Sequence, residues 1–402
     1  MLKILLMTLL LPAFCYGQEI SVIQEQDYND ASFKSLMFLK EELKDVKVVG
    51  LGESAHWLKR TYISKVQMVK FLHENCGFDV IAFEAPIYNL DSISAEISAG
   101  TITPADIRRN NSGVWGFPEV VELYKYVLET QETDRPLIYA GFDESFFRTP
   151  QLVLDYKVFV DSLSQQAQMP ITLDSTFYDA LARTAGNSYY FGKIPPADTL
   201  LLYEKLNLIK TVYAGLENKT TYFSYWNRLT ENLQGLYGKS YHTSNRDENM
   251  AKNVSFLAKE RYPDKKIMLW AATIHLVDNK TQGLDVKRVT KPKMGYFLKK
   301  EFGGTYYIMA FSPYTGKGGV KGYLGLMTRK VRTKKDSIER YVNDTYGCDY
   351  AYLSMRSDEV KALIEAKELD KANILGLKPH EMDIPNIVDG IFYMREEQVL
   401  GD

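Results

Sequence analysis

The chain has 402 residues, of which 45% are hydrophobic and 25% charged, and no internal repeat or low-complexity tract interrupts this ordinary globular balance. The formal net charge of −2 provides no basic surface for a nucleic-acid backbone, so we expect no nucleic-acid partner. The length suits about two or three average domains, or one large α/β domain with an insertion.

The N-terminal segment MLKILLMTLLLPAFCYGQEI has the layout of a secretory signal peptide. Lys3 precedes an apolar run from Ile4 to Leu11, which is too short to span a bilayer, and the small residue Gly17 precedes the expected cleavage point. We therefore predict a signal peptide over 1–17 and a mature chain over 18–402. This chain is expected to be secreted or periplasmic, with no membrane span after cleavage.

Short apolar runs then alternate with helical patterns. Strands are predicted over 47–53, 79–85 and 135–143, with helices over 62–77 and 119–131 between them. This alternation of short continuous apolar runs and helices is typical of a parallel sheet covered by helices.

The pattern changes from about residue 150 to about residue 262, where strand-like runs nearly vanish and successive helical patterns follow one another. We predict a long helical insertion over 150–262. The alternation resumes with predicted strands over 265–275, 305–312, 323–328, 348–355 and 390–396, and a helix over 293–303. The sequence thus predicts an α/β fold with a mostly parallel central sheet flanked by helices and a long helical insertion.

Ionisable residues end four consecutive predicted strands: Glu53, Glu84, Asp143 and His275. In open α/β sheets, sites assemble at the carboxyl ends of the strands. An aspartate after a strand is as often a turn or cap residue, and a lone histidine in an apolar run is more often a hydrogen-bonded core residue. Glu84, however, lies inside an apolar run, where an unpaired carboxylate would be costly. Together these residues predict a site at one edge of the sheet.

The first of these strands runs into the sequence GLGESAH, where Glu53 and His56 stand three positions apart. A carboxylate beside an imidazole raises its basicity and fixes its orientation, as a general base requires. Arg60, one helical turn beyond His56, is predicted to cover the same pocket as a cation. Arg246 opens a later helix, where its charge opposes the helix dipole, so we predict that it faces an anion or a carboxylate of the site.

Several segments resemble, in order and spacing, the erythromycin esterase family: GLGESAH, FEA, GVWGFPEVVELYKYV, GFD, NRDENMAKNVSFL, LWAATIHL and KMGYFLKKEFG. The resemblance covers about residues 46–312 and implies an α/β core with a long helical segment. It also implies hydrolysis of carboxylic esters, macrolide lactones included, by a histidine that acts as a base on water. It places Glu53, His56, Glu84 and His275 in the catalytic site, with Arg246 nearby.

The sequence departs from this family at the residue after the first histidine, where a glycine is common but Trp57 stands here. We expect Trp57 to change the shape of the pocket and the choice of substrate. The predicted substrate-binding residues are therefore Trp57, Arg60 and Arg246.

The leading hypothesis is hydrolysis of a small-molecule ester or lactone, without a cofactor and without a covalent enzyme intermediate. Ser54 lies beside His56 but lacks the Gly-x-Ser-x-Gly elbow that exposes an attacking serine. Two alternatives use the same residues. Glu53, His56, Glu84 and His275 are also a credible ligand set for a divalent metal in a metal-dependent hydrolase or peptidase. An exported module that binds a metal or tetrapyrrole without catalysis is the third hypothesis.

Overall fold

The computed structural model describes residues 20–23, 32–111, 114–147, 150–185, 195–238, 245–280, 291–320 and 328–401. The predicted signal peptide over 1–17 lies outside these residues, as does the predicted strand over 323–328 except for its last residue. Within the described ranges, every helix is too short or too polar to cross a membrane.

A mostly parallel sheet forms the centre of the molecule, with strand order β1-β8-β11-β6-β2-β5-β3-β4 and with β7 paired to the end of β6. The six strands from β11 to β4 in this order run parallel, β8 is antiparallel to β11, and β1 is antiparallel to β8. This confirms the predicted α/β fold with a mostly parallel sheet. The strands of this sheet are β1 (Ser21–Ile23), β2 (Val48–Glu53), β3 (Phe78–Pro86), β4 (Ile138–Asp143), β5 (Lys266–Ala272), β6 (Tyr306–Gly318), β7 (Arg329–Lys330), β8 (Tyr350–Ser354) and β11 (Gly390–Glu397).

Helices cover both faces of the sheet, and each face has its own buried core. Successive residues of β2 point to opposite sides of the sheet. Val49 and Leu51 pack with α3 (Lys59–Cys76) and α6 (Pro118–Thr130), whereas Val48 joins the core that includes α11 (Arg246–Phe256) and α13 (Met294–Phe302). The helices outside the insertion are α2 (Leu39–Glu42), α3 (Lys59–Cys76), α4 (Ile87–Ser98), α5 (Pro104–Asn110), α6 (Pro118–Thr130), α12 (Thr273–Leu276), α13 (Met294–Phe302), α14 (Ile338–Tyr346), α15 (Asp358–Ala366) and α16 (Ile384–Ile387). Of these, α2, α4, α5, α12, α14, α15 and α16 were not predicted.

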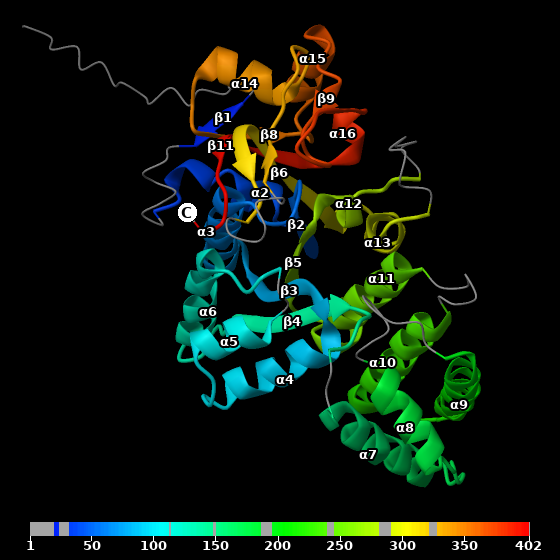
Figure 1. Ribbon diagram of the computed structural model, residues 1–402. Coiled ribbons are helices and arrows are strands. Elements are labelled where there is room, and N and C mark those ends of the chain that lie inside the picture. The colour runs from blue at the N-terminus through cyan, green and yellow to red at the C-terminus, as the bar shows by residue number, and fades with distance from the viewer. Residues whose placement is uncertain are drawn as a thin grey trace, which may run out of the picture.

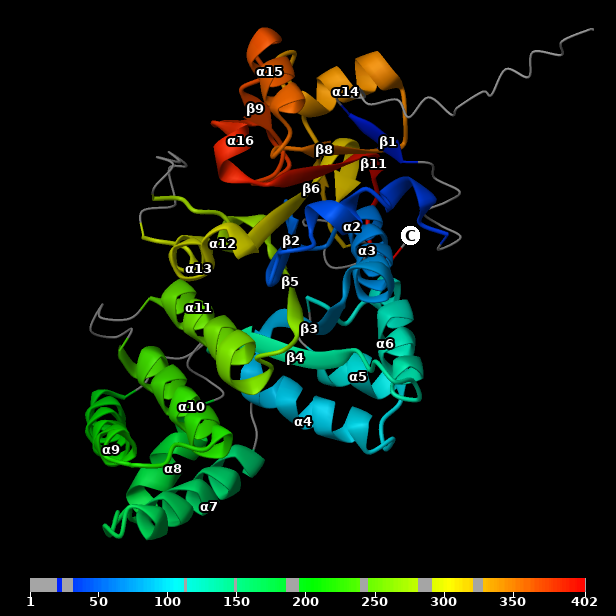
Figure 2. The ribbon, with the colours of Figure 1, turned by 180° about the vertical axis from the view of Figure 1, so that it is seen from behind.

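The connection between β4 and β5 is helical. It contains α7 (Pro150–Gln166), α8 (Ser175–Thr184), α9 (Pro196–Ala214), α10 (Thr221–Gly238) and α11 (Arg246–Phe256), followed by a π-helical turn over Leu257–Arg261. Figures 1 and 2 both show α7–α10 grouped at one end of the molecule, with α11 between that group and the sheet. The helices α7–α10 therefore lie to one side of the sheet edge at which β4 ends.

The predicted strand over 265–275 is too long. β5 ends at Ala272, and the chain turns into the short helix α12, which carries His275. Gly52 in the neighbouring strand makes this turn possible, because a Cβ atom there would lie 2.5 Å from Oγ1 and 3.0 Å from Cα of Thr273. His275 is thus presented by a helix rather than by a strand.

Candidate active site

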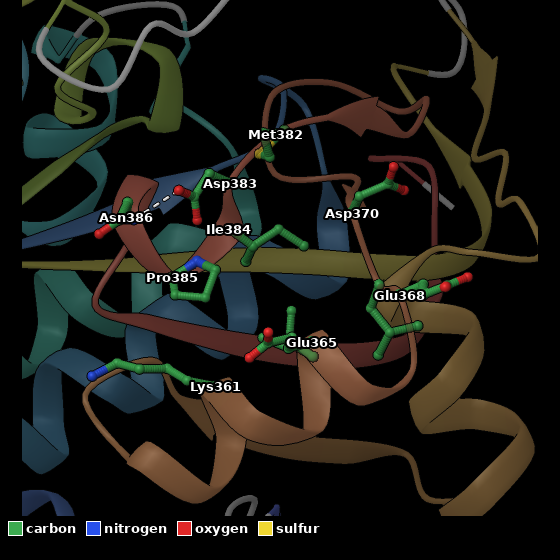
Figure 3. A pocket seen from close by; sticks show the side chains of 11 residues that line it. Lys361, Glu365, Glu368, Asp370, Met382, Asp383, Ile384, Pro385 and Asn386 are labelled. Atoms are coloured by element: carbon green, nitrogen blue, oxygen red, sulfur yellow. Dashed lines mark hydrogen bonds between the residues drawn. The ribbon is translucent and has the colours of Figure 1, made fainter.

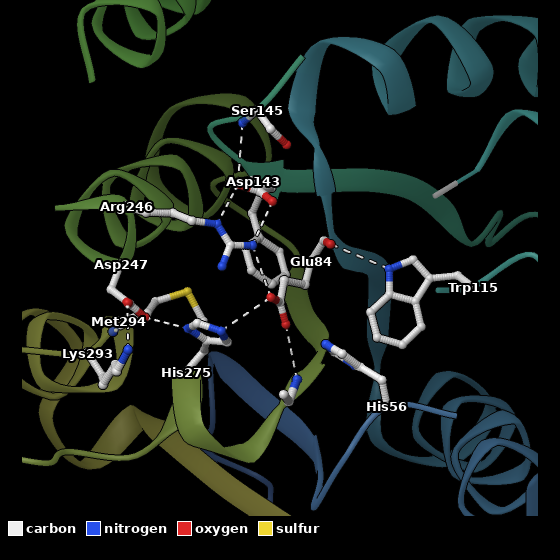
Figure 4. Close-up of polar contacts among 12 residues, drawn as sticks. His56, Glu84, Trp115, Asp143, Ser145, Arg246, Asp247, His275, Lys293 and Met294 are labelled. Carbon is white, nitrogen blue, oxygen red and sulfur yellow. Dashed lines mark hydrogen bonds and ion pairs between the residues drawn. The ribbon is translucent and has the colours of Figure 1, made fainter. Parts of the chain in front are cut away.

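The sheet brings the predicted strand-end residues together. The strands β2, β5, β3 and β4 are neighbours in this order, with Glu53 in register with Ala272, and Asp143 in register with Pro86. Because these strands are parallel, Glu53, Glu84 and Asp143 end at the same edge of the sheet, where α12 adds His275. Figure 4 shows His56, Glu84, Asp143, Arg246 and His275 around this edge.

The Glu53 carboxylate holds His56 with one oxygen and Lys65 with the other. Nδ1 of His56 lies 3.1 Å from Oε1 of Glu53, and Nζ of Lys65, on α3, donates to Oε2. Glu53 and Lys65 have no exposed side-chain surface, whereas 33% of the His56 side chain is exposed. The ion pair is therefore sealed from solvent and only the histidine is open to a substrate.

Lys65 is the functional residue of this group that the sequence analysis missed. Its ammonium lies 4.3 Å from the ring centroid of Trp270 and 5.9 Å from that of Trp115, in cation–π contact. Burial lowers the pKa of Lys65 to about 8, although the Glu53 carboxylate opposes this shift. The sequence does carry a signal, because this lysine interrupts the apolar stripe that Tyr62 and Val66 begin on α3.

The surroundings of His56 change the basicity of its imidazole. Burial lowers the pKa of His56, but the hydrogen bond and charge of Glu53, together with the charge of Glu84, outweigh burial and raise the pKa above its ordinary value. The Glu53 carboxylate thus makes this imidazole more basic and fixes its orientation, as the predicted general base requires.

Glu84 is the centre of a second group. Its Oε1 accepts from Nη2 of Arg246 at 3.0 Å and lies 3.3 Å from Nε2 of His275, and its Oε2 accepts from the Ala272 N–H at 3.1 Å. Burial raises the pKa of Glu84, but the charges of His275 and Arg246 outweigh it and bring the pKa to about 2. Glu84 is therefore a fixed anion between a histidine and an arginine (Figure 4).

Arg246 joins this anion to the end of β4. Its Nε and Nη2 donate to Oδ1 and Oδ2 of Asp143 at 3.0 and 2.7 Å, while Nη2 also reaches Glu84. The planar fork of a guanidinium fits two acceptors in this way, which a lysine ammonium would not. The structure thus places Arg246 against carboxylates, as its position at the start of α11 indicated.

His275 is oriented by Asp247, the residue after Arg246. Nδ1 of His275 lies 2.5 Å from Oδ1 of Asp247, which also accepts from the Met294 N–H, and Oδ2 accepts from Lys293 at 3.2 Å. Burial raises the pKa of Asp247, but His275 and Lys293 lower it more. Asp247 was not predicted as a site residue, because an acidic residue in the first turn of a helix is common and by itself indicates no site.

Trp57 adopts an uncommon backbone conformation directly beside the predicted base. Its φ of 66° lies in the left-handed region, which glycine adopts more readily, so the structure explains why a glycine would suit this position. The N–H of Trp57 donates to the Tyr62 hydroxyl at 3.0 Å and its carbonyl accepts from the Gly319 N–H at 2.8 Å. The rings of Trp57 and Trp115 lie 6.5 and 5.4 Å from the His56 ring, so both can flank a bound substrate.

Arg60 does not follow the prediction. Its guanidinium lies over the ring of Tyr350 in β8, 5.5 Å from the centroid, and its backbone N–H donates to Glu397 at the end of β11. In the strand order, β8 and β11 lie on one side of β2, and β3 with Glu84 lies on the other. Arg60 therefore does not cover the pocket of His56 as predicted. The helix α3 directs its side chain toward β8, on the side of β2 away from Glu84.

The predicted residues do not fit the alternative of a divalent metal site as they are arranged. In the part of the chain that the structure describes, no group of three or more His, Cys, Asp or Glu side chains is placed to hold a metal ion. The carboxylates face cationic side chains instead, Glu53 facing Lys65 and Glu84 facing Arg246. A metal would have to displace these ion pairs.

A separate surface hollow of about 590 Å³ lies between α15 and α16 (Figure 3). Acidic side chains surround it, among them Glu365, Glu368 and Asp383, with an apolar floor and Lys361 at one side. Its lining residues include no histidine, cysteine or arginine, so it lacks the paired base and cation found around His56 and Glu84.

Comparisons with known proteins agree with this architecture. The model of the Erythromycin esterase family matches residues 73–396, a range that contains Glu84, Arg246 and His275 but begins after His56. A protein of Bacillus subtilis (strain 168) named "Putative hydrolase YbfO" is 27% identical over 318 residues, which cover 73% of this chain and 70% of that protein.

Three solved structures share the fold over nearly the whole chain. The erythromycin esterase EreC, solved as a histidine-to-asparagine mutant in its open conformation, has a TM-score of 0.63 at 18% identity and covers 92% of this chain and 95% of its own. A protein from Bacillus cereus has a TM-score of 0.76 at 14% identity, with coverage of 95% and 96%. A succinoglycan biosynthesis protein has a TM-score of 0.75 at 14% identity, with coverage of 95% for both chains. At these identities the likeness shows the fold alone.

Proposed function

Because this chain belongs to the erythromycin esterase family, and is thus a hydrolase, we propose that it cleaves carboxylic esters or lactones with a water molecule activated by His56. The observation that carries the proposal is the Glu53 carboxylate, which binds Nδ1 of His56 while Lys65 holds its other oxygen. With Nδ1 directed at a carboxylate, Nε2 is the basic nitrogen, and Figure 4 shows the ring of His56 extending toward Glu84.

In the first step, His56 takes a proton from water while the water oxygen attacks the ester carbonyl carbon. The resulting imidazolium is stabilised by the Glu53 carboxylate, whose second oxygen is paired with the Lys65 ammonium in the buried pocket. No bond between substrate and enzyme is needed, so Ser54 has no part in the chemistry.

In the second step, the tetrahedral intermediate collapses and the C–O bond to the alcohol breaks. Both ring nitrogens of His275 face carboxylate oxygens, Nε2 that of Glu84 and Nδ1 that of Asp247, which fixes the orientation of the ring. We assign to His275 the transfer of a proton to the leaving alkoxide. The positive charge of Arg246, fixed by Asp143 and Glu84, favours the oxyanion in the same pocket.

The substrate class follows from what surrounds His56. Trp57 and Trp115 supply aromatic surface beside the exposed part of the imidazole, which suits a small molecule with an apolar body and one ester or lactone group. A macrolide lactone is one such molecule, and EreC is named as an erythromycin esterase. We therefore include macrolides among the proposed substrates.

The test is a turnover screen of the purified mature protein with p-nitrophenyl esters, simple lactones and macrolides. We expect turnover by the wild type, and a fall of about 10²- to 10⁴-fold in kcat for His56→Ala, the size of a lost general base. His275→Ala should also lose activity, whereas Ser54→Ala should retain it. The matched histidine control His380→Ala should retain it too, because His380 lies in the short strand β10 (His380–Glu381), outside the central sheet. Hydrolysis that is unchanged in both His56→Ala and His275→Ala would overturn the proposal.

A further inference from the structure

The helix α3 has no cap of its own. It begins at Lys59, and the residue in the capping position is Leu58, whose aliphatic side chain cannot accept a hydrogen bond. The first N–H groups of a helix need acceptors, and here they are supplied from the other end of the chain.

Glu397, the last residue of β11, fills the position of the missing cap. Its Oε1 accepts from the Arg60 N–H at 2.7 Å, and its Oε2 accepts from the Thr61 N–H at 3.2 Å and the Thr61 hydroxyl at 2.6 Å. The Lys59 N–H donates to the carbonyl of the next residue, Gln398, at 3.1 Å. Glu397 has only 1% of its surface exposed, so this carboxylate is a built part of the helix start.

A glycine in the neighbouring strand allows this close arrangement. Gly316 of β6 is in register with Glu397 and has a φ of 98°, where a side chain would be strained. A Cβ atom on Gly316 would also lie 2.0 Å from the Glu397 carbonyl oxygen. The end of β11 is therefore held tightly against β6 at the residue that caps α3.

The first two turns of α3 carry the side chains that hold the predicted base. Tyr62, the residue after Thr61, accepts the Trp57 N–H at its hydroxyl. Lys65, one turn further, donates to Glu53, which in turn binds His56. If the start of α3 were displaced, Tyr62 and Lys65 would move with it. The segment from Glu53 to Trp57 would then lose the two side chains that hold it.

We infer that Glu397 is a positioning residue for His56, which it controls through the start of α3. It touches neither the imidazole nor the substrate region, and it acts by fixing Tyr62 and Lys65. The inference deepens the proposed function, since its kinetic consequence rests on ester hydrolysis by His56. Its structural consequence, the orientation and basicity of His56, can be measured without any substrate.

The experiment compares Glu397→Gln and Thr61→Val with the wild type, and with Glu339→Gln as the matched control. Glu339 is also a fully buried glutamate in this part of the fold, but it accepts from Ser312 and Asn373 rather than from α3. The pKa of His56 is measured by NMR in protein with labelled histidine, and the His56→Ala spectrum assigns its signal among the five histidines. Burial raises the pKa of Glu397 to about 7, so kinetics are also recorded about one unit above that value, where its carboxylate is ionised.

We expect Glu397→Gln to lower the pKa of His56 toward its ordinary value, because its contact with Glu53 loosens. In the same variant kcat should fall about 10- to 100-fold with little change in KM, the effect of a misplaced catalytic group. Thr61→Val, which removes one of the hydrogen bonds, should show a smaller shift in the same direction, and Glu339→Gln should show none. If the pKa of His56 shifts in Glu397→Gln but the wild type has no esterase activity, the inference is supported and the proposed function is rejected. An unchanged His56 pKa in both Glu397→Gln and Thr61→Val would overturn the inference, whatever the activity.

Discussion

Lys65 and Glu53 form an ion pair in which neither side chain has any exposed surface, and the same carboxylate holds Nδ1 of His56. The pair lies beside the ring of Trp270, in surroundings that solvate charge poorly. A buried ion pair is seldom the most stable arrangement for a core, so this one is better explained by what it does for His56. It keeps the Glu53 carboxylate next to the imidazole of His56 without leaving that carboxylate unpaired.

Replacing Lys65 alone should therefore be severe. Lys65→Met leaves the Glu53 charge buried without its cation, and we expect a loss of about 3–5 kcal/mol in the free energy of unfolding. The double variant Glu53→Gln with Lys65→Met should recover much of this stability, because both charges are gone, but not the hydrolytic activity. Urea denaturation followed by circular dichroism measures the first effect, and ester turnover the second. A single variant as stable as the wild type would contradict this account of the pair.

Arg246 should resist replacement by another cation. Arg246→Lys keeps the charge but cannot bind Asp143 through two nitrogens and Glu84 at once, so we expect kcat to fall about 100-fold. Asp143→Asn, which keeps one acceptor oxygen opposite the arginine, should cost less. Steady-state kinetics of the two variants make the comparison. Equal activity of Arg246→Lys and the wild type would show that only the charge at this position matters.

Two glycines of β2, Gly50 and Gly52, form a matched pair. Their replacement separates the effect of displacing α12 from the effect of overpacking alone. A Cβ on Gly52 meets the Thr273 backbone and would displace α12 with His275, so Gly52→Ala should lower activity about 10-fold or more. A Cβ on Gly50 meets only the end of the Leu276 side chain, which can rotate away, so Gly50→Ala should remain active. Both variants should lose about 1–3 kcal/mol of stability from overpacking. The contrast fails if Gly50→Ala loses as much activity as Gly52→Ala.

The low pKa of Glu84 makes the free energy of unfolding depend on pH in the acid range. Its pKa in the folded protein is about 2, below the ordinary 4.5, so the ionised carboxylate stabilises the fold at any pH above 4.5. This contribution, about 3 kcal/mol, is lost as the pH falls from 4.5 through 2, because protonation breaks the contacts with His275 and Arg246. Urea unfolding over this range should show a shallower pH dependence for Glu84→Gln than for the wild type. Parallel curves for the two proteins would reject this assignment.

Removal of divalent metals should leave ester hydrolysis unchanged, within about twofold, because the carboxylates that would bind a metal face Lys65 and Arg246. The wild type is dialysed against a chelator and assayed before and after addition of Zn²⁺, Mn²⁺ or Mg²⁺. Activity that disappears and returns with one metal would instead support the metal-dependent hydrolase or peptidase.

Much of this protein could be inferred from its sequence. The alternation of apolar runs and helical patterns was enough to indicate a mostly parallel sheet, because each strand is buried on both faces and reads as an apolar run. The same reasoning gathered Glu53, Glu84, Asp143 and His275, since parallel strands end at a common edge and each of these residues lies close to the end of one.

The tertiary structure decided which groups these residues contact. Lys65 faces Glu53, Asp247 faces His275, and Glu397 caps a helix that begins 338 positions earlier in the chain, at Lys59. The same packing turned Arg60 toward Tyr350 instead of Glu84. Local patterns determine strands and helices because these depend on neighbours in the chain. The partners of a buried charge depend on strand order, register and helix placement, which only the folded chain brings about.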